Sequence, residues 1–151
     1  INPLLDANME LLHDSPGLNL YDDAWRIFSR NPNKPPHFVD QNAKIKNCLI
    51  SEGCYIYGEV ENSILSAGVT IEKDAFVKDS IIMQDTMIKK GGRVLKSIVD
   101  EEAVIEENAV VGGEKEITVI GSKAVIKSGA QVGEGDSVPA KRTIKAAKGG
   151  A

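Results

Sequence analysis

The sequence is poor in aromatic residues and in the side chains that most enzyme active sites use. Three Tyr, three Phe and one Trp occur in 151 residues, so a core must be built from Val, Ile, Leu and Ala. There are two histidines and two cysteines, and the cysteine spacing matches no metal or redox motif. Positive charge is not in excess either, because 18 Lys and Arg stand against 22 Asp and Glu. This balance argues against nucleic acid as a partner.

Long apolar runs are also missing. No apolar stretch approaches the length of about 18 residues that a membrane span needs. The first residues show neither the positively charged segment nor the apolar segment of a signal peptide. Two unpaired thiols are typical of a reducing cytoplasm. We therefore expect a soluble, cytoplasmic protein without a membrane partner. Because the chain begins with Ile1 and not Met, we also expect it to be a fragment of a longer protein.

The composition changes near residue 39. Five of the six prolines and four of the seven aromatic residues fall in the first 38 positions, whereas residues 40–138 contain no proline. Pro3 and the leucines after it predict a short helix, followed by an irregular connector. We expect the connector to cap or flank the rest of the chain, with its aromatic side chains on a neighbouring surface. The predicted parts are residues 1–38 (helix and connector), residues 39–140 (a repeat domain) and residues 141–151 (a disordered basic tail).

A repeat organises the chain after residue 39. Aliphatic residues recur in three steps of 17, at Val60, Val77, Val94 and Val111. The step before Val60 is 15 residues. The step after Val111 is 21, and the four extra residues fall in the polar stretch 112–116. The unit therefore accepts length changes only at certain corners.

One corner of the repeat shows what the pattern builds. Four segments run from an aliphatic residue, through polar positions and a small residue, to a second aliphatic residue six positions on. Their fourth positions are residues that accept a left-handed backbone, namely Asp74, Gly91, Asn108 and Gly129. This hexapeptide pattern predicts an all-β fold, a single-stranded parallel β-helix. Since one coil buries too few aliphatic side chains to offset its ordering entropy, the coils must stack.

The coils carry little that could do chemistry. A hexapeptide acyltransferase needs a histidine base and a zinc site needs several His or Cys ligands, yet His13 and His37 both precede the first coil. Cys48 and Cys54 fall in columns of small wall residues. The acidic clusters at 100–102 and 106–107 are interpreted as solvated corners. Neither glycine-rich phosphate-binding motif occurs. We therefore predict no catalytic, cofactor-binding or metal site in this chain.

The connector and the first coils together resemble one family. The matching segments are Ala7–Leu12, Leu18–Asp22, Trp25–Ile27, Pro35–Val39, Ile50–Cys54, Val60–Leu65 and Asp79–Met83. They are similar to the carboxy-terminal part of ADP-glucose pyrophosphorylase, also called glucose-1-phosphate adenylyltransferase, of the bacterial catalytic-subunit type. The resemblance implies that the β-helix is left-handed, an exception to the usual crossover rule.

The resemblance also implies a function for the parent protein. The parent transfers adenylyl from ATP to glucose 1-phosphate with Mg²⁺, giving ADP-glucose and pyrophosphate for glycogen synthesis. Its chemistry belongs to an amino-terminal catalytic domain that this sequence lacks, so the fragment alone is expected to be inactive and to hold no cofactor. Implied partners are that catalytic domain, other subunits of a homotetramer, and sugar-phosphate or nucleotide effectors.

Anionic effectors need basic residues. By resemblance, Lys123 and Lys127 in the last coil are candidates, with Arg26 and Arg30 in the connector as two more. At Glu101-Glu102 some relatives carry a basic residue that helps to hold the activator, so the effector preference is expected to differ here.

Two other interpretations remain open. One is a free-standing, trimeric hexapeptide acyltransferase, which the lack of histidine in the coils disfavours. The other is the carboxy-terminal part of a noncatalytic regulatory subunit of a sugar nucleotidyltransferase. The coding sequence upstream of Ile1 distinguishes them, since a complete glycine-rich nucleotide loop indicates the catalytic subunit.

Overall fold

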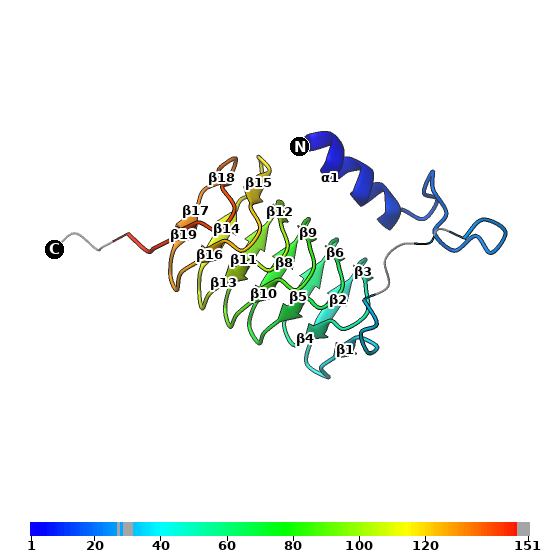
Figure 1. Cartoon of the computed structure of the whole chain (residues 1–151), viewed down its shortest axis with the longest axis horizontal. Coiled ribbons are helices and arrows are strands. Elements are labelled where there is room, and N and C mark those ends of the chain that lie inside the picture. Colours follow the sequence, from blue (N-terminus) through cyan, green and yellow to red (C-terminus); the bar gives the residue numbers. More distant parts are fainter. Residues whose placement is uncertain (27, 29–31, 148–151) are drawn as a thin grey trace.

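The chain forms a parallel β-solenoid with one short helix beside it (Figure 1). The computed structural model describes residues 1–26, 28 and 32–147. Each coil contributes one short strand to each of three sheets, and all strand pairs are parallel. The predicted hexapeptide-repeat solenoid is thus confirmed.

The three sheets, called A, B and C here, run the length of the solenoid. Sheet A contains β1 (Phe38–Val39), β4 (Tyr55–Ile56), β7 (Thr70–Ile71), β10 (Met87–Ile88), β13 (Val104–Ile105), β16 (Val125–Ile126) and β19 (Thr143–Ile144). Sheet B contains β2 (Lys44–Lys46), β5 (Glu59–Glu61), β8 (Phe76–Lys78), β11 (Arg93–Leu95), β14 (Val110–Gly112) and β17 (Gln131–Val132). Sheet C contains β3 (Leu49–Ile50), β6 (Ile64–Leu65), β9 (Ile81–Ile82), β12 (Ser97–Val99), β15 (Thr118–Ile120) and β18 (Ser137–Val138).

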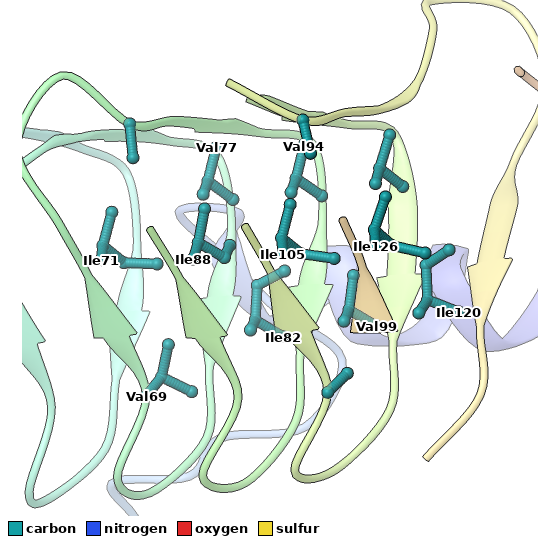
Figure 2. Packing of buried hydrophobic residues seen from close by; sticks show 14 of the residues in the cluster. Val69, Ile71, Val77, Ile82, Ile88, Val94, Val99, Ile105, Ile120 and Ile126 are labelled. Carbon is teal, nitrogen blue, oxygen red and sulfur yellow. The ribbon is translucent and has the colours of Figure 1, made fainter. Parts of the chain in front are cut away.

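One continuous aliphatic core fills the interior. Val60, Val77, Val94 and Val111 pair in register along sheet B, as the repeat of 17 predicts, and each is at most 1% exposed. Sheets A and C add their own buried files from the other two sides, which Figure 2 shows meeting in a common interior. Full burial of each aliphatic side chain stabilises the stack by about 1.5–3 kcal/mol.

All three corners of the coil use left-handed backbone. At the corner from sheet A to sheet B, the predicted residues have positive φ, including Asp74 at 60° and Asn108 at 57°. The corner from sheet C to sheet A was not predicted. Its left-handed file runs through Gly53, Gly68, Asp85, Glu102, Lys123 and Lys141. Long side chains occupy the later positions of this file, and they hid it in the sequence because such residues rarely adopt this conformation.

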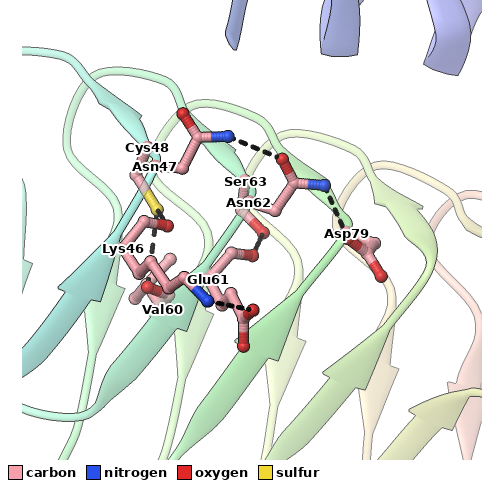
Figure 3. A network of polar contacts seen from close by, with 8 residues as sticks. All are labelled: Lys46, Asn47, Cys48, Val60, Glu61, Asn62, Ser63 and Asp79. Atoms are coloured by element: carbon pink, nitrogen blue, oxygen red, sulfur yellow. Dashed lines mark hydrogen bonds and ion pairs between the residues drawn. The ribbon is translucent and has the colours of Figure 1, made fainter. Parts of the chain in front are cut away.

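The corner from sheet B to sheet C is held by two polar files. Buried hydroxyls form the inner file: Ser80 Oγ donates to the Lys78 carbonyl (2.6 Å) and accepts from the Ser97 amide (3.1 Å). Cys48 occupies the equivalent place in the first coil and also points its thiol at the carbonyl of Lys46. An outer file links Asn47, Asn62 and Asp79 (Figure 3). Both cysteines are therefore small wall residues, as predicted.

The amino-terminal helix flanks the solenoid. Helix α1 (Asn2–Met9) continues into the 3₁₀ turn η1 (Glu10–Leu12), and Pro3 stands in its first turn, where the sequence predicted the start of a helix. Leu5 is 4% exposed and packs on Ile81 and Ile98, which project outward from sheet C. The connector thus places the helix on a side of the prism and not on its end.

The aromatic side chains of the connector do not pack as expected. Tyr21 is 81% exposed, Trp25 73% and Phe28 88%, so the prediction that they lie on a neighbouring surface is wrong within this chain. Figure 1 shows the connector reaching beyond the first coil, away from the prism. At the same end Ile45 is 37% exposed, although the residues that occupy its position in later coils, beginning with Val60, are buried.

The solenoid extends further than predicted at its carboxyl end. The prediction of a disordered tail from residue 141 is wrong for residues 141–144, because β19 pairs with β16 and the Val125 amide bonds to the Arg142 carbonyl (2.8 Å). The aliphatic residue in Thr143–Ile144 supplies the inward position that a further coil needs. Residues 148–151 of the predicted tail lie outside the described residues.

The extra residues of the 21-residue step leave the prism intact. They follow Gly112 at the corner from sheet B to sheet C, where φ is 80°. After them Thr118 still pairs with Ser97 in register, but its amide bonds to the Lys96 carbonyl (3.2 Å) and its hydroxyl donates to the Gly133 carbonyl (2.9 Å), so the bonds of the inner file are not repeated here. The insertion therefore projects from the corner without shifting the core.

Candidate functional site

Lys123 and Lys127, the basic residues predicted for the last coils, flank strand β16. Lys123 lies on the corner from sheet C to sheet A with φ 58°, and its amide bonds to the Glu101 carbonyl (2.9 Å). Its Nζ lies 3.5 Å from Glu102 Oε1. Lys127 follows β16, with Nζ 2.9 Å from Glu106 Oε1. Each lysine therefore already faces a carboxylate from the preceding coil.

The carboxylate of Glu106 accepts several hydrogen bonds in this region. It accepts from Lys127 Nζ and from the amide of Ser128 (3.1 Å). These contacts lower the pKa of Glu106 from its ordinary value of 4.5, with the Lys127 hydrogen bond as the largest cause. Lys127 is thus engaged in a network of several bonds, whereas the Lys123–Glu102 pair is longer and about half exposed on both sides.

The predicted connector arginines do not join this pair of lysines. Arg26 Nη2 lies 3.4 Å from Asp23 Oδ1, three residues earlier in the same exposed turn. Arg30 lies outside the described residues. No described contact links Arg26 to Lys123 or Lys127, so the candidates do not form one preassembled basic cluster.

A hollow at the corner from sheet A to sheet B was missed in the sequence. It has a volume of about 490 Å³, and its floor is formed by Tyr57 and Phe76. The guanidinium of Arg93 stands 5.0 Å from the centre of the Phe76 ring, and Lys73 lies at the rim. The step of 17 that pairs Phe76 with Arg93 is the signal that could have found it. Asp40, Glu59 and Asp74 also line the hollow together with Lys44, so three carboxylates are balanced by three cationic side chains.

The remaining reactive groups lack the geometry of a catalytic site. Cys54 is fully buried and Cys48 partly so, and burial raises the pKa of both thiols. In the part of the chain that the structure describes, no three His, Cys, Asp or Glu side chains gather where they could hold a metal ion. Helices within the described ranges are also too short or too polar to cross a bilayer.

Comparison with known proteins agrees with the fold. A family model for the GlmU-like carboxy-terminal hexapeptide domain matches residues 34–117. Glucose-1-phosphate adenylyltransferase of Acetivibrio thermocellus is 37% identical over 142 residues, covering 85% of this chain and 33% of the relative. The protein of the same name from Bacillus thuringiensis (strain Al Hakam) is 43% identical over 117 residues, covering 78% and 31%. The chain thus spans about a third of the length of these relatives. It belongs to the family of GlmU-like carboxy-terminal hexapeptide domains, and the similar curated proteins are glucose-1-phosphate adenylyltransferases.

Proposed function

We propose that this chain is the assembly and regulatory domain of a glucose-1-phosphate adenylyltransferase. The alignment with each of these two relatives covers only about a third of that relative's length. In the proposed whole protein an amino-terminal domain binds ATP and Mg²⁺ and makes ADP-glucose from glucose 1-phosphate. We expect the chain alone to make none, because among the described residues no three His, Cys, Asp or Glu side chains gather where they could hold a metal ion.

The exposed aromatic connector is the observation that carries this proposal. Trp25 and Phe28 each leave more than 70% of their surface in solvent, which is costly for large apolar side chains. The connector that carries them reaches beyond the first coil (Figure 1), and Ile45 in strand β2 of that coil is exposed as well. A catalytic domain docked against this end would cover both groups and fix the connector.

An anionic effector is part of the proposal, and Lys123 is its first contact. Lys123 has a partner at 3.5 Å whose side chain is 52% exposed, so a phosphate can displace Glu102 at little cost. Lys127 is held more tightly by Glu106, and Arg26 or Arg30 would have to reach the effector from the connector. A cytoplasmic location completes the proposal, since both cysteines are free thiols.

The decisive experiment uses the protein encoded by the sequence upstream of Ile1 together with this chain. We expect a complete nucleotide-binding loop upstream, ADP-glucose formation by the whole protein, and no formation by the 151-residue chain. Deleting residues 39–147 should abolish assembly and effector response. ADP-glucose formation by the chain alone would refute the proposal, and a degenerate nucleotide loop upstream would instead indicate a noncatalytic regulatory subunit.

A further inference from the structure

The outer surface of sheet A carries a file of uncharged side chains, here called the apolar file. Strand pairing sets six residues side by side: Phe38, Tyr55, Thr70, Met87, Val104 and Val125. Phe38 is 48% exposed, Tyr55 44% and Met87 36%. The ring centroids of Phe38 and Tyr55 lie 6.5 Å apart. A continuous exposed file of this kind is typical of an interaction surface.

A second file runs parallel to the first on the same face. It holds the residue that follows the inward position of each strand: Asp40, Tyr57, Glu72, Lys89, Glu106 and Lys127. The register is set by backbone bonds, such as those from the Glu72 amide to the Ile88 carbonyl (2.9 Å) and from the Lys89 amide to the Ile105 carbonyl (2.8 Å). We call this the charged file. Its order is negative, neutral, negative, positive, negative, positive.

Sheet A is the face left free by the rest of the described chain. Helix α1 covers sheet C through Leu5. On sheet B, Lys44 and Lys46 pair with Glu59 and Glu61 of the next coil. Sheet A combines exposed aromatic and aliphatic groups in one file with charges of alternating sign in the next, of which Glu106 and Lys127 also pair with each other within the chain.

We propose that two copies of this chain associate through sheet A, antiparallel, around a two-fold axis parallel to the strands and midway between β7 and β10. The inference rests on the assembly role proposed above and names its interface. This axis sets the apolar file of one copy on that of the other. In the charged files Glu72 meets Lys89, Asp40 meets Lys127, and the Tyr57 hydroxyl meets the Glu106 carboxylate. Because the interface is isologous, each pairing occurs twice.

Other arrangements of the same face are less favourable. A two-fold axis along the solenoid would set the apolar file of one copy on the charged file of the other, with Met87 opposite Lys89. Shifting the antiparallel register by one coil would set Glu72 opposite Glu72 in one direction and Lys89 opposite Lys89 in the other. The face spans roughly 24 Å from β1 to β16 at the usual strand spacing, which is small for a stable interface. We therefore expect a dissociation constant on the order of 1 µM.

A charge-swap experiment tests both the face and the register. Dissociation constants of the 151-residue chain and its variants are measured by sedimentation equilibrium, with thermal melts to verify folding. Glu72→Lys alone and Lys89→Glu alone should each weaken self-association at least about tenfold, because each sets like charges opposite each other twice. An equimolar mixture of the two variants should restore dimers, since every swapped residue then meets its complement. Strain inside either chain is unchanged by mixing, so only contact between copies explains the recovery.

A matched control comes from sheet B. Lys46→Glu disturbs a similar stacked ion pair within the chain, at 3.4 Å from Glu61, and should leave self-association unchanged. If the natural chain dimerises but neither swap weakens it, the assembly role stands and the sheet A interface is overturned. If the swaps weaken it but mixing restores nothing, the antiparallel register is overturned. A natural chain that stays monomeric about a hundredfold above the expected constant overturns the interface and the assembly role of the isolated domain together.

Discussion

The side-chain amide of Asn62 donates a hydrogen bond of 2.6 Å to the carboxylate of Asp79, although seventeen residues separate the two in the chain. Asn47 donates in turn to Asn62 at 3.0 Å. All three residues have φ between 46° and 51°. The ladder therefore joins three successive coils at a corner where the backbone must be left-handed.

Replacing Asn62 should separate the two contributions of this ladder. Asn62→Ala loses both side-chain hydrogen bonds. Alanine also accepts the left-handed backbone less readily than asparagine, so the substitution should lower the unfolding free energy by about 2–3 kcal/mol. Asn62→Gly loses the same bonds but accepts the backbone, so it should cost about 1 kcal/mol less. Urea unfolding measures both. Equal losses for Ala and Gly would show that the backbone conformation contributes nothing.

The buried hydroxyl of Ser80 should matter more than its size suggests. Ser80→Ala removes a donor to the Lys78 carbonyl and leaves the Ser97 amide without its acceptor, in a place that water does not reach. An unsatisfied buried group costs about 1–3 kcal/mol. Ser80→Cys should cost less, because Cys48 fills the equivalent place in the first coil. Chemical unfolding gives the comparison, and a harmless Ser80→Ala would contradict the role of the inner file.

Ionised Glu106 should make part of the unfolding free energy depend on pH in the acidic range. Its pKa is lower in the folded chain than its ordinary value of 4.5, mainly through Lys127, so the unfolded state binds the proton more readily. The contribution is present above the ordinary pKa and is lost as pH falls through the folded one. Unfolding free energy measured between about pH 5 and pH 3 should fall less steeply in Glu106→Gln than in the natural chain. Glu114→Gln, at an exposed position on another corner, is the control. Parallel curves for Glu106→Gln and the natural chain would refute the effect.

The two thiols should resist modification until the chain unfolds. Burial raises the pKa of Cys48 and Cys54, so less thiolate is present at a given pH than in a free cysteine. We expect slow reaction with a disulfide reagent at mildly alkaline pH, with Cys54, which is 0% exposed, slower than Cys48. Labelling in denaturant should be fast for both. Rapid native labelling of Cys54 would mean that the second coil opens readily.

Lys123 should govern anion binding at the corner from sheet C to sheet A. We expect Lys123→Ala to weaken binding of inorganic phosphate at least about threefold, and Glu102→Gln to strengthen it by removing the competing carboxylate. An NMR titration of the chain would measure both, with the exposed Lys115→Ala as control. If Lys115→Ala weakens binding as much as Lys123→Ala, phosphate is held by general charge and not at this corner.

The repeat in the sequence predicted the core and one of the three corners correctly. Val94 and Asp74 stand where the step of 17 and the preference for left-handed backbone place them, because both follow from local rules that every coil repeats. Glu102 and Lys123 occupy a corner that stacking imposes against their own preference, so the sequence did not reveal it.

The candidate site was harder to predict than the fold. Basic residue type and family resemblance pointed to Lys123 and Lys127, but their carboxylate partners come from a coil 21 residues earlier. The aromatic residues of the connector were misplaced for a related reason. On the proposed function, the surface that covers Trp25 belongs to another domain, so no local rule of this sequence could locate it.

The insertion after Gly112 shows that this corner accepts extra residues, which are held by bonds from Lys96 Nζ to the carbonyls of Glu114 and Lys115. Thr118 recovers the strand pairing of the column it rejoins, although its hydroxyl donates to the Gly133 carbonyl and not two residues back as Ser80 and Ser97 do. The extra residues therefore leave the register of the strands unchanged. A fluorophore, an affinity peptide or a small binding module inserted between residues 113 and 116 would be attached at a fixed position along the solenoid axis. The same corner offers natural variants a place to acquire new contacts while the scaffold is kept.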